Sequence, residues 1–204
     1  MTTRLSLTGL VQQARDCQRC PLYRFATQTV FGEGPAHAPV MLVGEQPGDQ
    51  EDLQGRPFVG PAGKILDRAL TDAGVNRSRV YVTNAVKHFK FEPRGKRRLH
   101  KKPNTAEIEA CKWWLDQELD LIKPALAVAL GATAARALAG RPVAIGTSRG
   151  HLIELREGLP SLVTIHPSFL LRMPDPDAKA QEYRRFVEDL RLIAKHVPAA
   201  KRAA

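Results

Sequence analysis

The chain contains 204 residues, of which 43% are hydrophobic. That length can bury one core, and it fits a single domain over residues 1–197, with a short basic tail at 198–204, more easily than two domains. Lysine and arginine number 31 against 21 acidic residues, a net charge of +10 that favours a polyanionic partner. No apolar stretch is long enough for a signal peptide or a membrane span, so we expect a cytoplasmic protein without a membrane partner.

Four short apolar runs bounded by turn residues predict buried strands, at 40–44, 80–86, 125–131 and 162–165. Helical patterns lie between and after them, at 60–74, 104–123, 132–140 and 178–197. The second helix begins with a capping-box pattern, because Glu107 follows Asn104 by three residues. Strands that alternate with helices predict an α/β fold, a three-layer α/β/α sandwich around a central, mostly parallel four-stranded sheet.

Polar residues stand where three of the predicted strands end. Glu45 and Gln46 follow the first strand, Asn84 lies near the end of the second, and His166 follows the last. Ligands of such sheets bind beyond the carboxyl ends of the strands, so these four side chains are expected to meet in one crevice. Taken singly, Asn84 could instead cap a turn, and His166 could be a hydrogen-bonded histidine at the rim.

The basic charge is concentrated in one segment. Residues 86–103 hold eight lysines and arginines against one acid, and His100 stands among five of these cations in "GKRRLHKKP". This density predicts a phosphate-binding segment, whereas the simpler alternative is a solvated loop that aids solubility. A histidine is unusual in such a run, since lysine or arginine would bind phosphate better.

Three cysteines in a chain without an export signal argue against a disulfide framework. Cys17 and Cys20 form a C-x-x-C pair, and Cys111 lies on the buried face of the second predicted helix. With His88 they make a plausible Cys3His ligand set, whose spacing allows an iron–sulfur cluster or zinc equally. We expect a structural role for this site. The alternative is a buried Cys111 unrelated to an exposed C-x-x-C pair.

Several stretches together resemble one family. They are "CQRCPLY", "GEQPGDQEDLQGRPFVGPAGKILDRAL", "VYVTNAVKHFKF", "GKRRLHK", "LGATAA" and "HPSFLLR", between Cys17 and Arg172. This set resembles the family 4 class of the uracil-DNA glycosylase superfamily, and more closely its UdgX branch, whose members crosslink to their DNA. Gln46 and His88 depart from ordinary family 4 enzymes, which have alanine and cysteine there. These departures and the basic insertion argue against ordinary multiple turnover.

The resemblance implies a [4Fe-4S] cluster on Cys17, Cys20, His88 and Cys111. It implies a monomer that binds uracil-containing DNA, preferably single-stranded. Phe58 would stack on a flipped uracil, unless it serves only core packing, and Asn84 would bind the O4 and N3 edge. His166 would donate a hydrogen bond to O2. Further substrate contacts are expected from Gly44, Gly48 and Asp49, and DNA contacts from Lys96, Arg97, Arg98, Lys101, Ser168 and Arg172.

The resemblance also assigns the nucleophile to His100, which would attack C1′ of the sugar before water does. Its five flanking cations are expected to keep the ring neutral by like-charge repulsion. Glu45 would accept the histidine proton or stabilise the cationic sugar, and Gln46 completes the predicted catalytic set. The product would be a protein that acts once. The competing interpretations are a conventional multiple-turnover family 4 glycosylase and a non-enzymatic, metal-stabilised nucleic-acid-binding module.

Overall fold

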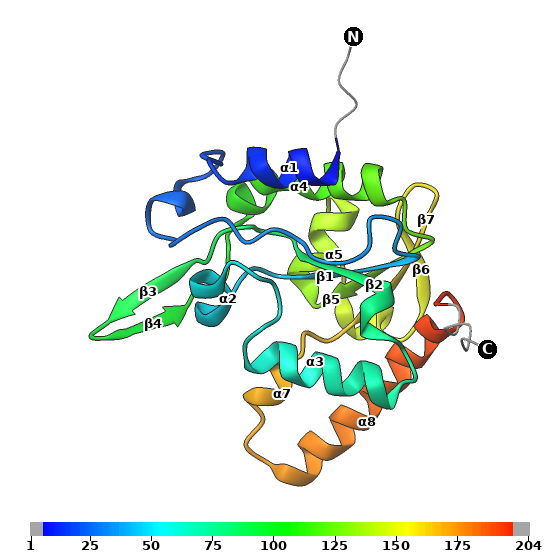
Figure 1. Ribbon diagram of the computed structural model, residues 1–204. Helices are drawn as coiled ribbons and strands as arrows, with labels where there is room; N and C mark the ends of the chain where they lie inside the picture. Colours follow the sequence, from blue (N-terminus) through cyan, green and yellow to red (C-terminus); the bar gives the residue numbers. More distant parts are fainter. Residues whose placement is uncertain (1–5, 198–204) are drawn as a thin grey trace, which may run out of the picture.

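A computed structural model describes residues 6–197. Its centre is a five-stranded sheet in the order β2-β1-β5-β7-β6 (Figure 1). The strands are β1 (Val40–Gly44), β2 (Val80–Asn84), β5 (Leu126–Leu130), β6 (Leu152–Arg156) and β7 (Leu159–Thr164). The first four in this order are parallel, and β6 pairs antiparallel with β7 at the edge. The mostly parallel sheet is confirmed, but the expected number of strands, four, is wrong.

The strand that the sequence did not reveal is β6. It lies at the edge of the sheet, and most of its residues are only partly buried, with Leu152 51% exposed. It therefore lacks the continuous apolar run of its neighbours. A tight turn at Gly158, with a φ of +70°, returns the chain into β7, which begins three residues before the expected 162. The tail predicted at 198–204 lies outside the described residues.

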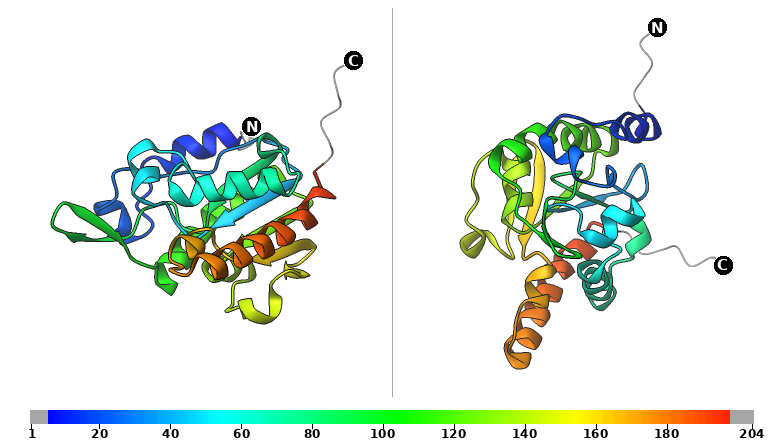
Figure 2. Two further views of the ribbon diagram at one scale, coloured as in Figure 1. Left: turned by 90° about the horizontal axis from the view of Figure 1, so that it is seen from below. Right: turned by 90° about the vertical axis from the view of Figure 1, so that its left-hand side faces the viewer.

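Helices cover both faces of the sheet, which confirms the three-layer sandwich (Figures 1 and 2). One face carries α1 (Leu7–Ala14), α4 (Thr105–Ile122) and α5 (Ala132–Ala139), and the other carries α3 (Pro61–Asp72) and α8 (Pro176–Ala194). Alternate residues of each of the four parallel strands supply the two cores. In β2, for example, Tyr81 packs toward α4, whereas Val80 and Val82 pack toward α3.

The capping box of α4 is present as predicted. The Asn104 side chain accepts a hydrogen bond from the Glu107 N–H at 2.9 Å, and the Glu107 carboxylate accepts one from the Asn104 N–H at 2.7 Å. Short elements escaped prediction because each has too few residues to show a period. They are η1 (Pro21–Arg24), α2 (Asp49–Gln54), η2 (Arg77–Arg79), α6 (Ile145–Ser148) and α7 (Ser168–Leu171).

The basic segment is not a loop but a two-stranded antiparallel hairpin of β3 (Phe91–Arg94) and β4 (Arg97–His100). It extends away from the body of the molecule (Figure 1). Gly95, with a φ of +58°, lies in the turn between the strands. His100 is the last residue of β4, at the end nearest the domain. In the described part of the chain, no helix is both long and apolar enough to cross a membrane.

Candidate functional site

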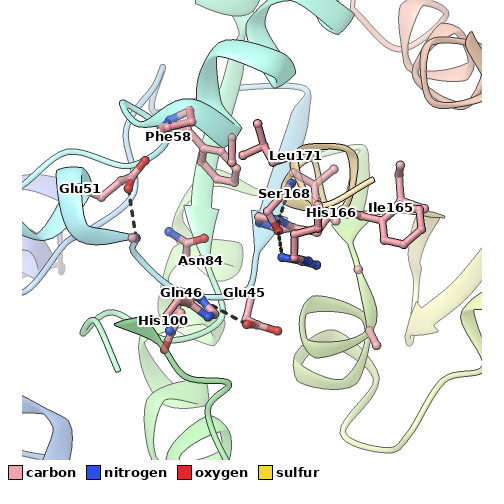
Figure 3. A pocket seen from close by; sticks show the side chains of 18 of the residues that line it. Glu45, Gln46, Glu51, Phe58, Asn84, His100, Ile165, His166, Ser168 and Leu171 are labelled. Atoms are coloured by element: carbon pink, nitrogen blue, oxygen red, sulfur yellow. Dashed lines mark hydrogen bonds and ion pairs between the residues drawn. The ribbon is translucent and has the colours of Figure 1, made fainter. Parts of the chain in front are cut away.

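A cavity of about 860 Å³ opens at the carboxyl ends of the parallel strands. Glu45, Gln46, Asn84 and His166 all line it, as predicted, and His100 reaches it from the hairpin (Figure 3). These side chains come from the loop after β1, from β2 and β4, and from the loop after β7, so the fold brings together residues that are far apart in the sequence. This is the position that open α/β sheets use for ligands.

The inner wall of the cavity combines an aromatic ring with a buried amide. Phe58 supplies an aromatic face, and the Oδ1 atom of Asn84 is buried without a hydrogen-bond partner among the described residues. At Gly44, a Cβ atom would lie 2.3 Å from Asn84 Oδ1 and 2.6 Å from Phe58 Cζ, so only glycine leaves both side chains in place. Phe58 itself has a φ of +57°, a strained value for a residue with a side chain.

The carbonyl of Phe58 is packed against Gly63, where a Cβ atom would lie 1.7 Å from the carbonyl oxygen. This close contact at the first turn of α3 fixes the strained backbone. The surrounding packing thus sets the position of the Phe58 ring, whose centroid lies 6.1 Å from that of His166. The Phe58 ring also packs among the core residues on the α3 and α8 side of the sheet, and it forms part of the cavity wall.

His166 is held by its neighbours in one tautomer. The Ser168 main-chain N–H donates to His166 Nδ1 at 3.2 Å, and the Ser168 hydroxyl lies 2.8 Å from the same nitrogen. Because a backbone N–H can only donate, Nδ1 carries no proton, and the neutral ring bears its proton on Nε2. Burial, together with His100 and Arg172, lowers the pKa of His166 to about 4. The ring is therefore a neutral donor at physiological pH.

His100 faces Glu45 across the mouth of the cavity, with Nε2 3.5 Å from Glu45 Oε1. The other carboxylate oxygen of Glu45 accepts a hydrogen bond from the hydroxyl of Thr133, at the start of α5. The His100 side chain is 47% exposed. Partial burial lowers the pKa of His100, Arg172 lowers it further, and Glu45 opposes both.

A lowered pKa of His100 was expected, but its cause was not. The cation that contributes is Arg172, at the end of α7, rather than the lysines and arginines beside His100 in sequence. Those neighbours lie on an exposed hairpin, where water and salt screen their charges. Arg172 also donates to the Ser168 hydroxyl at 3.1 Å, so it connects the two histidines of the cavity.

Gln46 does not have the free side chain expected of a catalytic group. Its amide donates to the carbonyls of Lys90 and Lys101, at 3.1 and 3.0 Å, and its oxygen accepts from the Lys90 N–H at 3.2 Å. Lys90 and Lys101 flank the hairpin and are joined by a main-chain hydrogen bond of 3.0 Å. Gln46 therefore fastens the base of the hairpin that carries His100.

Arg98 and Asp49 also differ from expectation, because they pair with each other. Arg98 Nε lies 2.6 Å from Asp49 Oδ1, and Arg98 Nη1 lies 2.5 Å from a carboxylate oxygen of Asp52. The guanidinium also lies over the rings of Phe89 and Phe91, with 5.4 and 5.1 Å to their centroids. Arg98 thus fixes the hairpin to α2 and is not free for phosphate, and Asp49, although it lines the cavity, is engaged in this pair.

The other residues predicted to bind DNA differ in their exposure and in their contacts. Lys96 and Arg97 are exposed at the tip of the hairpin, with no ion pair within residues 6–197. Lys101 lies 2.6 Å from Glu92, in an exposed pair of the kind that contributes little stability. Ser168 is engaged with His166 and Arg172.

Two residues that support the cavity were missed. Glu51 accepts hydrogen bonds from the N–H groups of Gly48 and Gly60, at 3.1 and 2.7 Å, and so ties the start of α2 to the start of α3. Its position three residues after Gly48 was a capping signal that could have revealed it. Thr133 was within the "LGATAA" stretch, but only the fold shows that it reaches Glu45.

The predicted metal ligands are all buried. Cys17 and Cys20 lie before η1, His88 follows β2, and Cys111 is on α4. The Trp114 indole N–H donates to Cys17 Sγ at 3.0 Å, and the Lys87 N–H donates to Cys111 Sγ at 3.2 Å.

Burial raises the pKa of Cys20 and raises that of Cys111 to about 12, so a bound cation is needed to keep these thiols ionised. The His88 ring hydrogen-bonds Thr29 through Nε2 at 3.0 Å, which leaves its buried Nδ1 without a partner in the described structure. Over residues 6–197, no three His, Cys, Asp or Glu residues lie close enough to hold a single metal ion. Three thiols and an imidazole are soft or borderline donors, a set that suits an iron–sulfur cluster or zinc.

The family model described as the uracil DNA glycosylase superfamily matches residues 31–191. A type-4 uracil-DNA glycosylase from Thermotoga maritima is 38% identical over 193 residues, which cover 93% of this chain and 94% of the relative. A protein of the same name from Pyrobaculum aerophilum is 37% identical over 177 residues, covering 83% and 87%. A type-5 uracil-DNA glycosylase from P. aerophilum is 31% identical, covering 63% and 67%. The chain therefore belongs to the uracil DNA glycosylase superfamily.

Proposed function

We propose that this protein removes uracil from DNA and then becomes covalently linked through His100 to C1′ of the abasic sugar. The observation that carries the proposal is the position of His100. It enters the cavity from outside the sheet and faces Glu45, with Asn84 and His166 lining the same cavity. An imidazole placed there meets the sugar of any nucleotide whose base occupies the inner wall.

In this proposal, Phe58 and Asn84 recognise the base. A flipped uracil stacks on the Phe58 ring, and its N3–H donates to the buried Asn84 Oδ1, which otherwise lacks a partner in the described structure. The Asn84 amide N–H donates in turn to O4. An unpartnered buried acceptor is costly, so a ligand that supplies a donor is favoured over one that does not.

Departure of the base is assisted by His166. As the C1′–N1 bond lengthens, its electron pair moves onto the uracil, and the sugar becomes a cation. The Nε2–H of His166 donates to uracil O2, where negative charge develops, without transferring its proton. The low pKa of His166 suits this role, because a neutral donor does not trap the product as an ion pair.

Capture of the sugar is assigned to His100. The lone pair of a neutral ring nitrogen forms the new bond to C1′, while the electron pair of the broken bond leaves with uracil N1, which later takes up a proton. The imidazole is then cationic until its remaining N–H proton is lost. Glu45 is the anion nearest to the ring and stabilises both the sugar cation and the charged imidazole.

The tip of the hairpin and the cysteine site support this chemistry without taking part in it. Exposed Lys96 and Arg97 at the hairpin tip bind phosphates, and single-stranded DNA is preferred because its bases flip at lower cost. A [4Fe-4S] cluster on Cys17, Cys20, His88 and Cys111 would join the N-terminal segment to α4 and supply structural stability when bound. We propose a cytoplasmic monomer in which residues 1–197 form one domain.

The test combines uracil-containing single-stranded DNA with the wild type, with His100→Ser, and with His151→Ser as a control at an exposed histidine that does not line the cavity. Wild type and the control should give a DNA band that stays on the protein after denaturation, with at most one equivalent of uracil released. His100→Ser should release uracil without this band and leave abasic DNA. Its product can exceed one equivalent.

Other outcomes point to the other functions. Abundant turnover by the wild type, with alkali-labile sites and no retained band, would identify a conventional family 4 glycosylase. Neither uracil release nor a retained band would identify a binding module. Retention of DNA by His100→Ser, mapped by proteolysis to another peptide, would remove His100 from the role of nucleophile.

A further inference from the structure

A fully buried ion pair lies behind the base-binding wall and takes no part in the proposed chemistry. The ammonium of Lys87 and the carboxylate of Glu118, on α4, are both 0% exposed, with 2.6 Å between Nζ and Oε2. Replacing such a pair with apolar residues is often neutral or stabilising, so stability alone is a weak reason to keep it. Its contacts indicate another role.

The Lys87 ammonium has three N–H bonds, and each has a partner. They are the Thr83 hydroxyl at 2.6 Å, the Glu118 carboxylate, and the main-chain carbonyl of Asn84 at 2.8 Å. The third contact is the informative one. Asn84 is the last residue of β2, and the chain beyond it stays beside β1, where the Ala85 N–H donates to the Gly44 carbonyl at 2.9 Å.

The side chains of β2 point alternately to the two faces of the sheet, which explains why Lys87 contacts Asn84 through its main chain. Tyr81 and Thr83 point toward α4 and both donate to Glu118, at 2.9 Å each. Asn84, the next residue, points its side chain the other way, into the cavity beside Phe58. The carbonyl is therefore the part of Asn84 that the Lys87 ammonium reaches from the α4 side.

We propose that Lys87, held by Glu118, is a positioning residue that fixes the end of β2 and so aims the Asn84 amide at the base. This inference rests on the proposed role of Asn84 in reading uracil. Lys87 also donates its main-chain N–H to Cys111 Sγ, so the same residue joins the base-binding wall to the cysteine site.

The test measures binding rather than chemistry, so it does not depend on covalent capture. Single-stranded DNA carries one 2′-fluoro-2′-deoxyuridine, whose fluorine slows loss of the base, or the matching 2′-fluoro-2′-deoxycytidine. The ratio of the two dissociation constants reports how well the Asn84 amide is aimed. Iron content and Tm are recorded for every variant.

The main variant is Lys87→Met combined with Glu118→Gln, because removing one charge alone would leave the other buried and unpaired. It should lower the preference for uracil by roughly tenfold, toward the value of Asn84→Ala, while binding to uracil-free DNA is retained. Tyr81→Phe is the matched control. It removes a hydrogen bond to the same carboxylate without touching Asn84, and it should lower Tm while leaving the uracil preference unchanged.

An unchanged preference in the folded double variant would overturn the proposal, as would an equal loss in Tyr81→Phe. If the double variant fails to fold or lacks iron while Tyr81→Phe is normal, the pair serves the fold and the proposal is wrong. A wild type without preference for uracil, or an Asn84→Ala variant that keeps it, would instead refute the role given to Asn84.

Discussion

Replacing Arg98 with methionine removes the ion pairs that hold the β3–β4 hairpin against α2. Of its two acidic partners, Asp49 is 43% exposed and contributes little, whereas Asp52 is 0% exposed and would be left as a buried, unpaired carboxylate. Such a loss costs about 3–5 kcal/mol. The Thr27 N–H continues to donate to Asp52, at 3.0 Å, so we expect the lower end, about 3 kcal/mol.

For a domain of this size, about 3 kcal/mol lowers Tm by roughly 6–12 °C, which circular dichroism can measure directly. His100 follows Arg98 by two residues on the same strand, so the fraction of excised uracil matched by crosslink should fall as well. Arg97→Met is the control, because it removes the same charge from an exposed neighbour that has no ion pair in the described chain. A Tm equal to that of Arg97→Met would refute this account of the hairpin.

Three further predictions concern pH, salt and the shape of the cavity. Capture needs a neutral His100, and partial burial lowers its pKa from 6.5, so the crosslinked fraction should decline in acid with a midpoint below pH 6.5. A midpoint above 6.5 in a pH series would contradict this. Neutralising both Lys96 and Arg97 should flatten the slope of log K against log salt for single-stranded DNA by about 1.4, and an unchanged slope would place the DNA elsewhere. Gly44→Ala places a methyl group 2.3 Å from Asn84 Oδ1, so single-turnover uracil excision should fall on the order of 10²-fold while binding to uracil-free DNA is kept. Normal excision would mean that the base does not bind beside Asn84.

The parallel strands and the convergence of the polar residues could be predicted because both follow from local patterns. β1, β2 and β5 are buried along their full length, so their apolar runs are unmistakable. Fold geometry then places the residues after each strand at one edge of the sheet. The capping box of α4 is likewise a signal contained within four residues.

What escaped prediction depends on distant partners or on exposed surfaces. β6 is an edge strand with charged side chains, and the hairpin is too rich in lysine and arginine to show a strand pattern. Gln46 and Arg98 were given chemical roles because their partners, 44 to 55 positions away, cannot be inferred from composition. The cation that acts on His100 comes from α7 for the same reason.

The two ends of the hairpin segment are hydrogen-bonded to each other where the segment joins the domain. Lys90 and Lys101 are hydrogen-bonded to each other, and Gln46 binds both, so the ten residues between them form a side branch of the chain. Cutting that branch out and joining its ends would remove His100, and it would also remove Arg98 and leave the buried Asp52 of α2 without its cation. If His100 acts as proposed above, this one branch carries both the nucleophile and the Arg98 contacts that hold it, so a single inserted segment separates a glycosylase that turns over from one that acts once.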